Sequence, residues 1–201
     1  MLRTKRGQGR AVVRKSIGDM TNKELGGLFP IIIAEPDSRW PKLFEREKNK
    51  IRKALGKRNT IRIEHIGSTA IPRLKAKPTI DILLEVPGLM DSDGAIKKLK
   101  KLGYHYIPKP ENPPPHMMFA KGYTIHGFKG QAYHIHVRYR GDWDELYFRD
   151  YLKSHLDVAR EYGELKVRLS RTYRNDREAY TDKKNSFIKR ITRMARKEKA
   201  K

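Results

Sequence analysis

The sequence contains no cysteine. This absence excludes disulfide bonds, thiolate nucleophiles and zinc sites built on cysteine, and it removes the strongest sequence argument for secretion. The chain also lacks a run of about 18 apolar residues and a signal-peptide pattern at its start. We therefore expect a cytoplasmic protein that does not interact with a membrane, in which any metal is bound by carboxylate, imidazole or substrate oxygen atoms.

Acidic residues are scarce relative to basic ones, with 23 Asp and Glu against 46 Lys and Arg, which gives a formal net charge of +23. The excess is concentrated at the two ends. Residues 1–15 contain six basic and no acidic residues, and residues 183–201 contain nine basic residues and one acidic residue. Basic arms can bind RNA through its phosphates, but most such segments are simply solvated. RNA binding through these ends is therefore an alternative and not the leading prediction.

A length of 201 residues predicts one domain with a substantial core. Residues 1–15 show no periodicity and are expected to form a disordered basic arm. We expect residues 16–182 to form a single domain, and residues 183–201 to form the end of the last helix and a basic tail. No pattern in the sequence specifies the number of subunits.

Apolar periodicity predicts an α+β fold with a mixed sheet. Alternation indicates strands, and a spacing of three to four residues indicates helices. The expected strands are 60–66, 79–86, 104–107, 116–123 and 131–140, and the expected helices are 40–55, 91–102, 143–152, 158–169 and 179–194.

Four segments carry weaker expectations. Residues 20–28 are at best weakly helical because two glycines interrupt the pattern, and residues 29–33 could add a strand at a sheet edge. The connection between the last two strands is expected to contain Gly127 and Gly130. The proline-rich residues 108–115 are expected at the rim of a cleft.

Segment 79–86 separates cleanly into two faces because strand side chains alternate. One face is apolar, and the other contains Asp81, Leu83 and Glu85. An Asp in an otherwise apolar strand is costly unless it binds a cation. In the later strand, His134 and His136 share one face with basic residues, so the two imidazoles could together bind one metal or one phosphate.

Residues 64–72 predict a strand that ends in a tight turn. Gly67 would let the backbone approach an anion closely, and the hydroxyl and N–H groups of Ser68 and Thr69 could donate to a phosphate. Lys77 follows shortly afterwards. The sequence therefore predicts a phosphate site next to the Asp81 metal site.

The run EHIGSTAIP at 64–72, the following Lys77-Pro78 and Asp81, and the run YHIHV at 133–137 together resemble the GrpB family of small bacterial and archaeal proteins. The resemblance continues to Tyr180-Thr181 and covers nearly everything from about residue 28 to residue 194. It implies a nucleotidyltransferase-like fold, in which helices pack on a mixed sheet and a helical part follows.

In nucleotidyltransferases, a Gly-Ser turn holds nucleotide phosphates and three strand carboxylates bind two divalent cations. By resemblance Asp81 matches the first carboxylate, whereas Leu83 stands at the second position and a histidine at the third. Replacing carboxylates with imidazoles shifts the metal preference from Mg²⁺ toward Mn²⁺ or Zn²⁺. Glu64 is a candidate replacement carboxylate, whereas Glu85 is about 13 Å along the strand from Asp81 and too far to share its ion.

The leading prediction is a nucleotidyltransferase-like enzyme that binds a nucleotide or another phosphorylated small molecule with a divalent metal, Mg²⁺ or Mn²⁺ or else Zn²⁺. One alternative is a non-catalytic nucleotide- or RNA-binding module, and a weaker one is a metal-dependent phosphohydrolase with Glu64 as base. The predicted catalytic residues are Asp81, His134, His136 and Glu64, of which the first three are also the predicted metal ligands. The predicted phosphate-binding residues are Gly67, Ser68, Thr69, Lys77 and Arg138.

Overall fold

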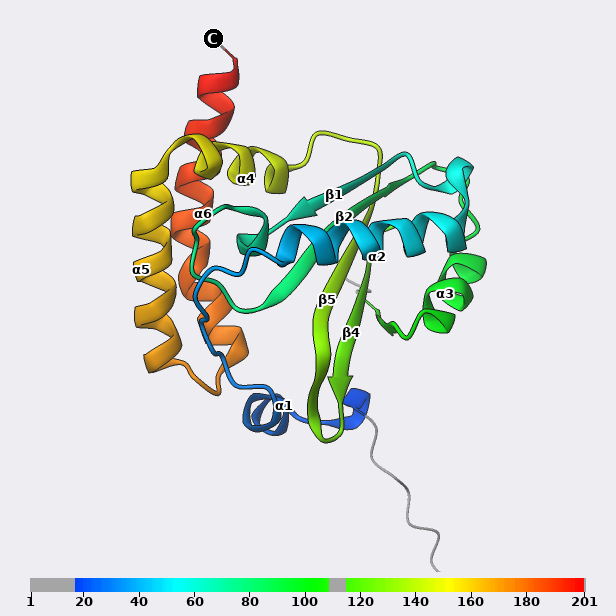
Figure 1. The fold of residues 1–201 in the computed structure, drawn as a ribbon, viewed down its shortest axis with the longest axis horizontal. Helices are drawn as coiled ribbons and strands as arrows, with labels where there is room; N and C mark the ends of the chain where they lie inside the picture. Colours follow the sequence, from blue (N-terminus) through cyan, green and yellow to red (C-terminus); the bar gives the residue numbers. More distant parts are fainter. Residues whose placement is uncertain (1–16, 109–114, 201) are drawn as a thin grey trace, which may run out of the picture.

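Five strands form one mixed sheet in the order β1-β2-β5-β4-β3 (Figure 1). The computed structural model describes residues 17–108 and 115–200, so the predicted N-terminal arm and most of the proline-rich segment lie outside the described residues. Strands β2 and β5 pair in parallel, and the other pairs are antiparallel. The strands are β1 Arg62–Ile66, β2 Thr79–Val86, β3 His105–Ile107, β4 Met117–Thr124 and β5 Gly127–Tyr139.

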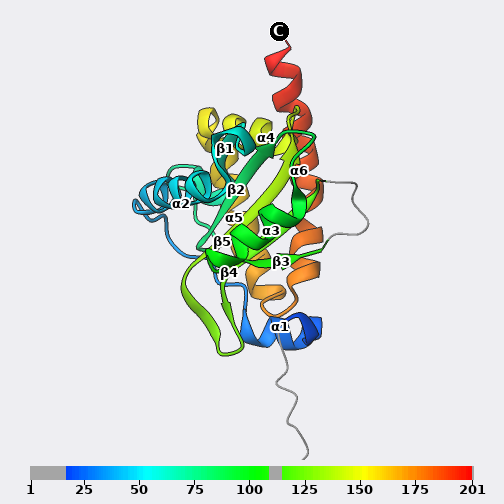
Figure 2. The same ribbon diagram turned by 90° about the vertical axis from the view of Figure 1, so that its right-hand side faces the viewer.

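Helices cover both faces of this sheet, and Figure 2 shows α2 and α6 on opposite sides of it. The expected α+β architecture with a helical C-terminal part is confirmed. Among the described residues, no helix is long and apolar enough to cross a membrane. The helices are α1 Asn22–Leu28, α2 Trp40–Leu55, α3 Ser92–Lys101, α4 Asp144–Ser154, α5 Leu156–Thr172 and α6 Arg177–Lys199.

The predicted division of β2 into two faces is confirmed. Ile80, Ile82 and Leu84 are buried in the core that the sheet forms with α2 and α3. Burying these apolar side chains is the main driving force for that layer. The opposite face, which contains Asp81, is directed toward α4, α5 and α6, whose own apolar residues form a second core.

Several helix ends follow the sequence signals. Asp91 caps α3 by accepting a hydrogen bond from the Gly94 backbone N–H at 2.9 Å. Gly56, with a φ of 85°, is the C-cap of α2, a position at which glycine is favoured. The N-cap of α2 is Arg39, and Asp37 accepts hydrogen bonds from the backbone and side chain of that arginine.

Helix α1 is a regular helix, which corrects the expectation of weak helicity. A capping box at Thr21 and Glu24 stabilises its first turn. Gly26 lies within the helix, where it allows close packing. A Cβ at this position would overlap the carbonyl oxygen of Asn175, which lies between α5 and α6. The first glycine of the pair is therefore explained by a tertiary contact and not by a break in the helix.

Three further expectations need correction. Residues 29–33 do not form a strand; the bridge nearest to them joins Ala34 to Ala76. Strand β5 begins at Gly127, so the connection to β4 is shorter than expected, and Gly130 lies inside the strand. Helix α6 continues to Lys199, so the basic residues predicted to form a tail lie on an ordered helix.

Replacing Gly26 by Ala tests the packing of α1. We expect Gly26→Ala to lower the free energy of unfolding by about 1–3 kcal/mol, because the new methyl group overpacks the contact with Asn175. Gly27→Ala is the matched control, since a Cβ there meets nothing within 4 Å, and it should be neutral or stabilise by up to about 1 kcal/mol. Urea denaturation measures both. Equal effects of the two substitutions would contradict the packing explanation.

Candidate functional site

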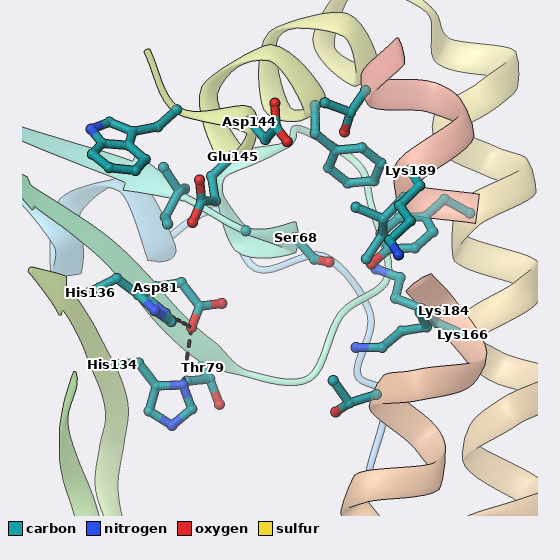
Figure 3. Close-up of a pocket in the computed structure, with 18 of the residues that line it drawn as sticks. Ser68, Thr79, Asp81, His134, His136, Asp144, Glu145, Lys166, Lys184 and Lys189 are labelled. Carbon is teal, nitrogen blue, oxygen red and sulfur yellow. Dashed lines mark hydrogen bonds and ion pairs between the residues drawn. The ribbon is translucent and has the colours of Figure 1, made fainter. Parts of the chain in front are cut away.

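A large cleft lies between the polar face of the sheet and the helices α4, α5 and α6 (Figure 3). Its volume is about 1430 Å³, which exceeds the roughly 300–1,000 Å³ of typical small-molecule pockets. One wall is formed by β2 and β5, and the opposite wall mainly by α6. The predicted site residues that line it are Gly67, Ser68, Lys77, Asp81, His134, His136 and Arg138.

The three predicted metal ligands meet on the sheet wall of this cleft. Strand register places His134 directly beside Asp81, and His136 is the next residue on the same face. His134 Nδ1 lies 3.1 Å and His136 Nε2 lies 3.8 Å from Asp81 Oδ1. One ligand atom from each residue lies within 4.8 Å of the other two, and these three form the group suited to a metal in the part of the chain that the structure describes.

This donor set fits a divalent transition metal. Ligand atoms around one ion at about 2.1 Å lie roughly 3.0–3.4 Å apart, close to the distances seen here. One carboxylate with two imidazoles is a combination that binds zinc, manganese or iron and leaves positions open for water or substrate. Tyr123 supports it, because its hydroxyl lies 2.9 Å from His134 Nε2. Without a metal, the Nδ1–H group of His134 donates to Asp81 Oδ1. A metal bound at Nδ1 would instead leave the ring proton on Nε2, where the Tyr123 hydroxyl oxygen accepts it.

The electrostatics favour the ligating forms of these side chains. Burial opposes charge on Asp81, but hydrogen bonds from His134 and His136 outweigh burial and lower its pKa well below the usual range. Burial also lowers the pKa of His134, and the neighbouring Asp81 offsets this only in part. An ionised carboxylate and a neutral imidazole are the states that bind a metal.

Gly67 brings the turn close to the Asp81 carboxylate. Its φ of 69° favours glycine, and a Cβ at this position would overlap Asp81 Oδ2. Ser68 is directed into the cleft (Figure 3). Thr69 is not: it is only 4% exposed, and its hydroxyl donates to the Thr79 carbonyl oxygen at 3.0 Å. The predicted role of Thr69 in phosphate binding thus finds no support, because its hydroxyl fastens the turn to β2.

Glu64 does not join the metal ligands. Its Oε2 lies 2.8 Å from Arg149 Nη1, and it is not among the residues that line the cleft. Leu83, at the second carboxylate position, is 0% exposed, and Glu85 is buried in an ion pair with Arg62. Neither Glu64 nor Glu85 therefore replaces the missing carboxylates of a two-metal site, and within the described residues no second carboxylate groups with Asp81 and the two histidines.

Basic residues from the helices complete the cleft, and sequence reasoning did not single them out. Arg177 and Lys184 come from α6, two turns apart on one face, and Lys166 comes from α5. The sequence signal for the residues of α6 is general, since Arg and Lys are abundant on the polar face of that helix. Lys166 carried a more specific signal, since it lies one turn after Tyr162 on the side of α5 that is otherwise apolar.

His65 lies beneath the turn and gives the site a measurable pH dependence. Its ring stacks on Phe44, and its Nε2 donates to the Thr69 hydroxyl oxygen at 2.9 Å. Burial lowers the pKa of His65 from 6.5 to about 4. The unfolded chain therefore binds a proton more readily than the folded one between these values.

The contribution of His65 to the free energy of unfolding should accordingly be fully present above about pH 6.5 and should decrease as the pH drops toward 4. The contribution of His65 is about 2–3 kcal/mol over this window. Urea unfolding at several pH values measures it, and His65→Gln should show a shallower decline. A decline of equal slope in both proteins would assign the pH dependence to other groups.

Comparison with known proteins was consistent at the levels of sequence and fold. The GrpB protein family matches residues 30–194. A UPF0157 protein of Pseudomonas aeruginosa is 43% identical over 163 residues, which cover 80% of this chain and 66% of that protein. The glutamate-rich protein GrpB of Alkalihalophilus pseudofirmus is 34% identical, over 80% of this chain and 93% of that protein.

A crystal structure of the conserved protein GrpB from Enterococcus faecalis has the same fold. It superposes with a TM-score of 0.73 at 30% identity, covering 85% of this chain and 100% of the other. The fold comparison and the sequence comparisons therefore point to the same family. The chain described here belongs to the GrpB family.

Proposed function

We propose that this chain is a nucleotidyltransferase-like enzyme that acts on a nucleotide or another phosphorylated small molecule and uses one divalent metal ion. The observation that carries the proposal is the meeting of Asp81, His134 and His136 on the wall of a cleft whose other charged residues are mostly cationic. A bound divalent ion would polarise a phosphoryl oxygen there as a Lewis acid. Its donor set favours Mn²⁺ or Zn²⁺ over Mg²⁺.

The chain's own residues would bind and orient the phosphates. Gly67 keeps the turn free of a side chain beside Asp81, and Ser68 offers a hydroxyl from the same turn. Lys77 and Arg138 line the cleft near these groups and contribute positive charge. Arg138 lies 3.7 Å from Glu145, so part of its charge is already balanced. These contacts position the substrate, which is the main contribution a protein makes to phosphoryl transfer.

Two alternatives rest on the missing carboxylates. With Leu83 buried at the second position, the chain could bind a nucleotide without transferring any group. A phosphohydrolase needs a base, and Glu64 is held by Arg149 away from the cleft. The binding module is therefore the better supported alternative. If the chain binds RNA through its ends, the C-terminal contacts would come from the basic side of α6. The N-terminal contacts would come from the arm outside the described residues.

Metal binding provides the first test. We expect Asp81→Asn and His136→Gln each to weaken Mn²⁺ or Zn²⁺ binding at least about 10- to 100-fold, because each removes a ligand. Isothermal titration calorimetry at pH 7 measures the affinity. Glu64→Gln is the matched control on the neighbouring strand and should leave the affinity nearly unchanged. An affinity that Asp81→Asn does not alter would place the metal elsewhere.

The reaction products separate the three functions. With nucleoside triphosphates and Mn²⁺, a transferase releases pyrophosphate together with a transferred nucleotide product, whereas a hydrolase releases phosphate or pyrophosphate without one. A binding module leaves the nucleotide intact. Nucleotide binding and product formation that are both insensitive to Asp81→Asn would overturn the proposal.

A further inference from the structure

The lysines that line the cleft include Lys77, Lys166 and Lys184, hereafter the lysine cluster. Lys77 precedes β2, whereas the other two project from α5 and α6 toward the sheet (Figure 3). Lys166 is only 2% exposed, although lysine is among the residues least often buried. A buried ammonium group is costly unless something balances its charge.

No carboxylate among the described residues forms an ion pair with the lysine cluster. Lys166 Nζ donates to the Lys75 carbonyl oxygen at 2.6 Å and lies 4.6 Å from the centre of the Tyr162 ring. Lys184 Nζ lies 4.3 Å from the centre of the Tyr180 ring. Carbonyl oxygens and aromatic faces stabilise an ammonium group without neutralising it. Asp81 attracts Lys77 and Lys184 from the sheet wall without forming an ion pair with them, so the positive charge of the lysine cluster is only partly balanced and can bind another anion.

Lys184 repels both of the other ammonium groups of the cluster. Burial, with repulsion from Lys184, lowers the pKa of Lys166 to about 7. Burial lowers the pKa of Lys184 to about 8 and, together with repulsion from Arg177 and Lys184, that of Lys77 to about 8. The three side chains also line the same cleft, so one multivalent anion bound there would offset this burial and repulsion.

Thr192 provides a second, independent observation. It lines the same cleft from α6 and is buried, yet its hydroxyl has no hydrogen-bond partner among the described residues. Buried hydroxyl groups nearly always have a partner. A ligand oxygen in the cleft would supply one.

We propose that Lys166 and Lys184 form an anion subsite on the helical wall of the cleft, separate from the metal ligands on the sheet wall. A ligand that contacts both walls has to extend across the cleft. The chemical class that fits is an anion with two or more linked phosphate groups, one at the metal and another at the lysines. This inference deepens the proposed function and rests on it only for the placement of the reacting phosphate.

Inorganic tripolyphosphate is the probe, titrated calorimetrically into the full chain at pH 7 with EDTA and about 150 mM salt, which screens non-specific attraction. Lys184→Gln should weaken binding at least tenfold. Lys183→Gln is the matched control, because it removes the same charge from an exposed neighbour that does not line the cleft, and it should change affinity less than twofold. Lys166→Met should resemble Lys184→Gln; if it fails to fold, Lys184→Gln alone decides.

Equal losses in Lys183→Gln and Lys184→Gln would overturn the subsite, since binding would then follow net charge. With Mn²⁺ present in place of EDTA, orthophosphate that binds as tightly as tripolyphosphate would overturn the requirement for linked phosphates. The titration in EDTA also separates this proposal from the proposed function, because no metal takes part in it. A loss of tripolyphosphate affinity in Lys184→Gln but not in Lys183→Gln supports the subsite even if metal binding proves to be absent.

Discussion

Strand β2 packs against the hydrophobic core on one face and lines the cleft on the other, and the position of the site depends on this division. Ile80, Ile82 and Leu84 are fixed in the core beneath α2 and α3, and this fixes the register of the strand. Because side chains alternate, Asp81 must then face the cleft. A shift of one residue would bury its charge among the apolar side chains of the core and turn three large apolar side chains away from that core. The same apolar contacts that stabilise the sheet therefore place the carboxylate.

The alternation of strand residues explains why so much of the site could be predicted. The alternation of side chains places Asp81 on the polar face of β2 and His134 with His136 on the polar face of β5. The parallel pairing of β2 with β5 then puts these two faces on the same side of the sheet. The sequence itself does not specify that pairing, which arises from long-range packing. The GrpB resemblance supplied the expectation that the two segments meet.

The misses share a physical cause, because each concerns a residue whose partner is distant in sequence. Gly26 was interpreted from local propensity, but its neighbour is Asn175. Glu64 was a free carboxylate in sequence and is bound to Arg149 in the fold. The hydroxyl of Thr69 likewise donates a hydrogen bond to the Thr79 carbonyl oxygen. Propensity and periodicity describe the neighbours of a residue along one element, and these contacts join different elements.

The segment between β1 and β2 links the two layers of the molecule. Near its start, Thr69 is hydrogen-bonded to β2, and further along Ile71 and Leu74 are buried in the core of α4, α5 and α6. Lys166 adds a buried hydrogen bond from α5 to this segment at Lys75. Swinging the helices away from the sheet would break these contacts together. The two walls are thus held at a set separation, so the length of a molecule that bridges them is selected by the fold itself, before any individual contact forms.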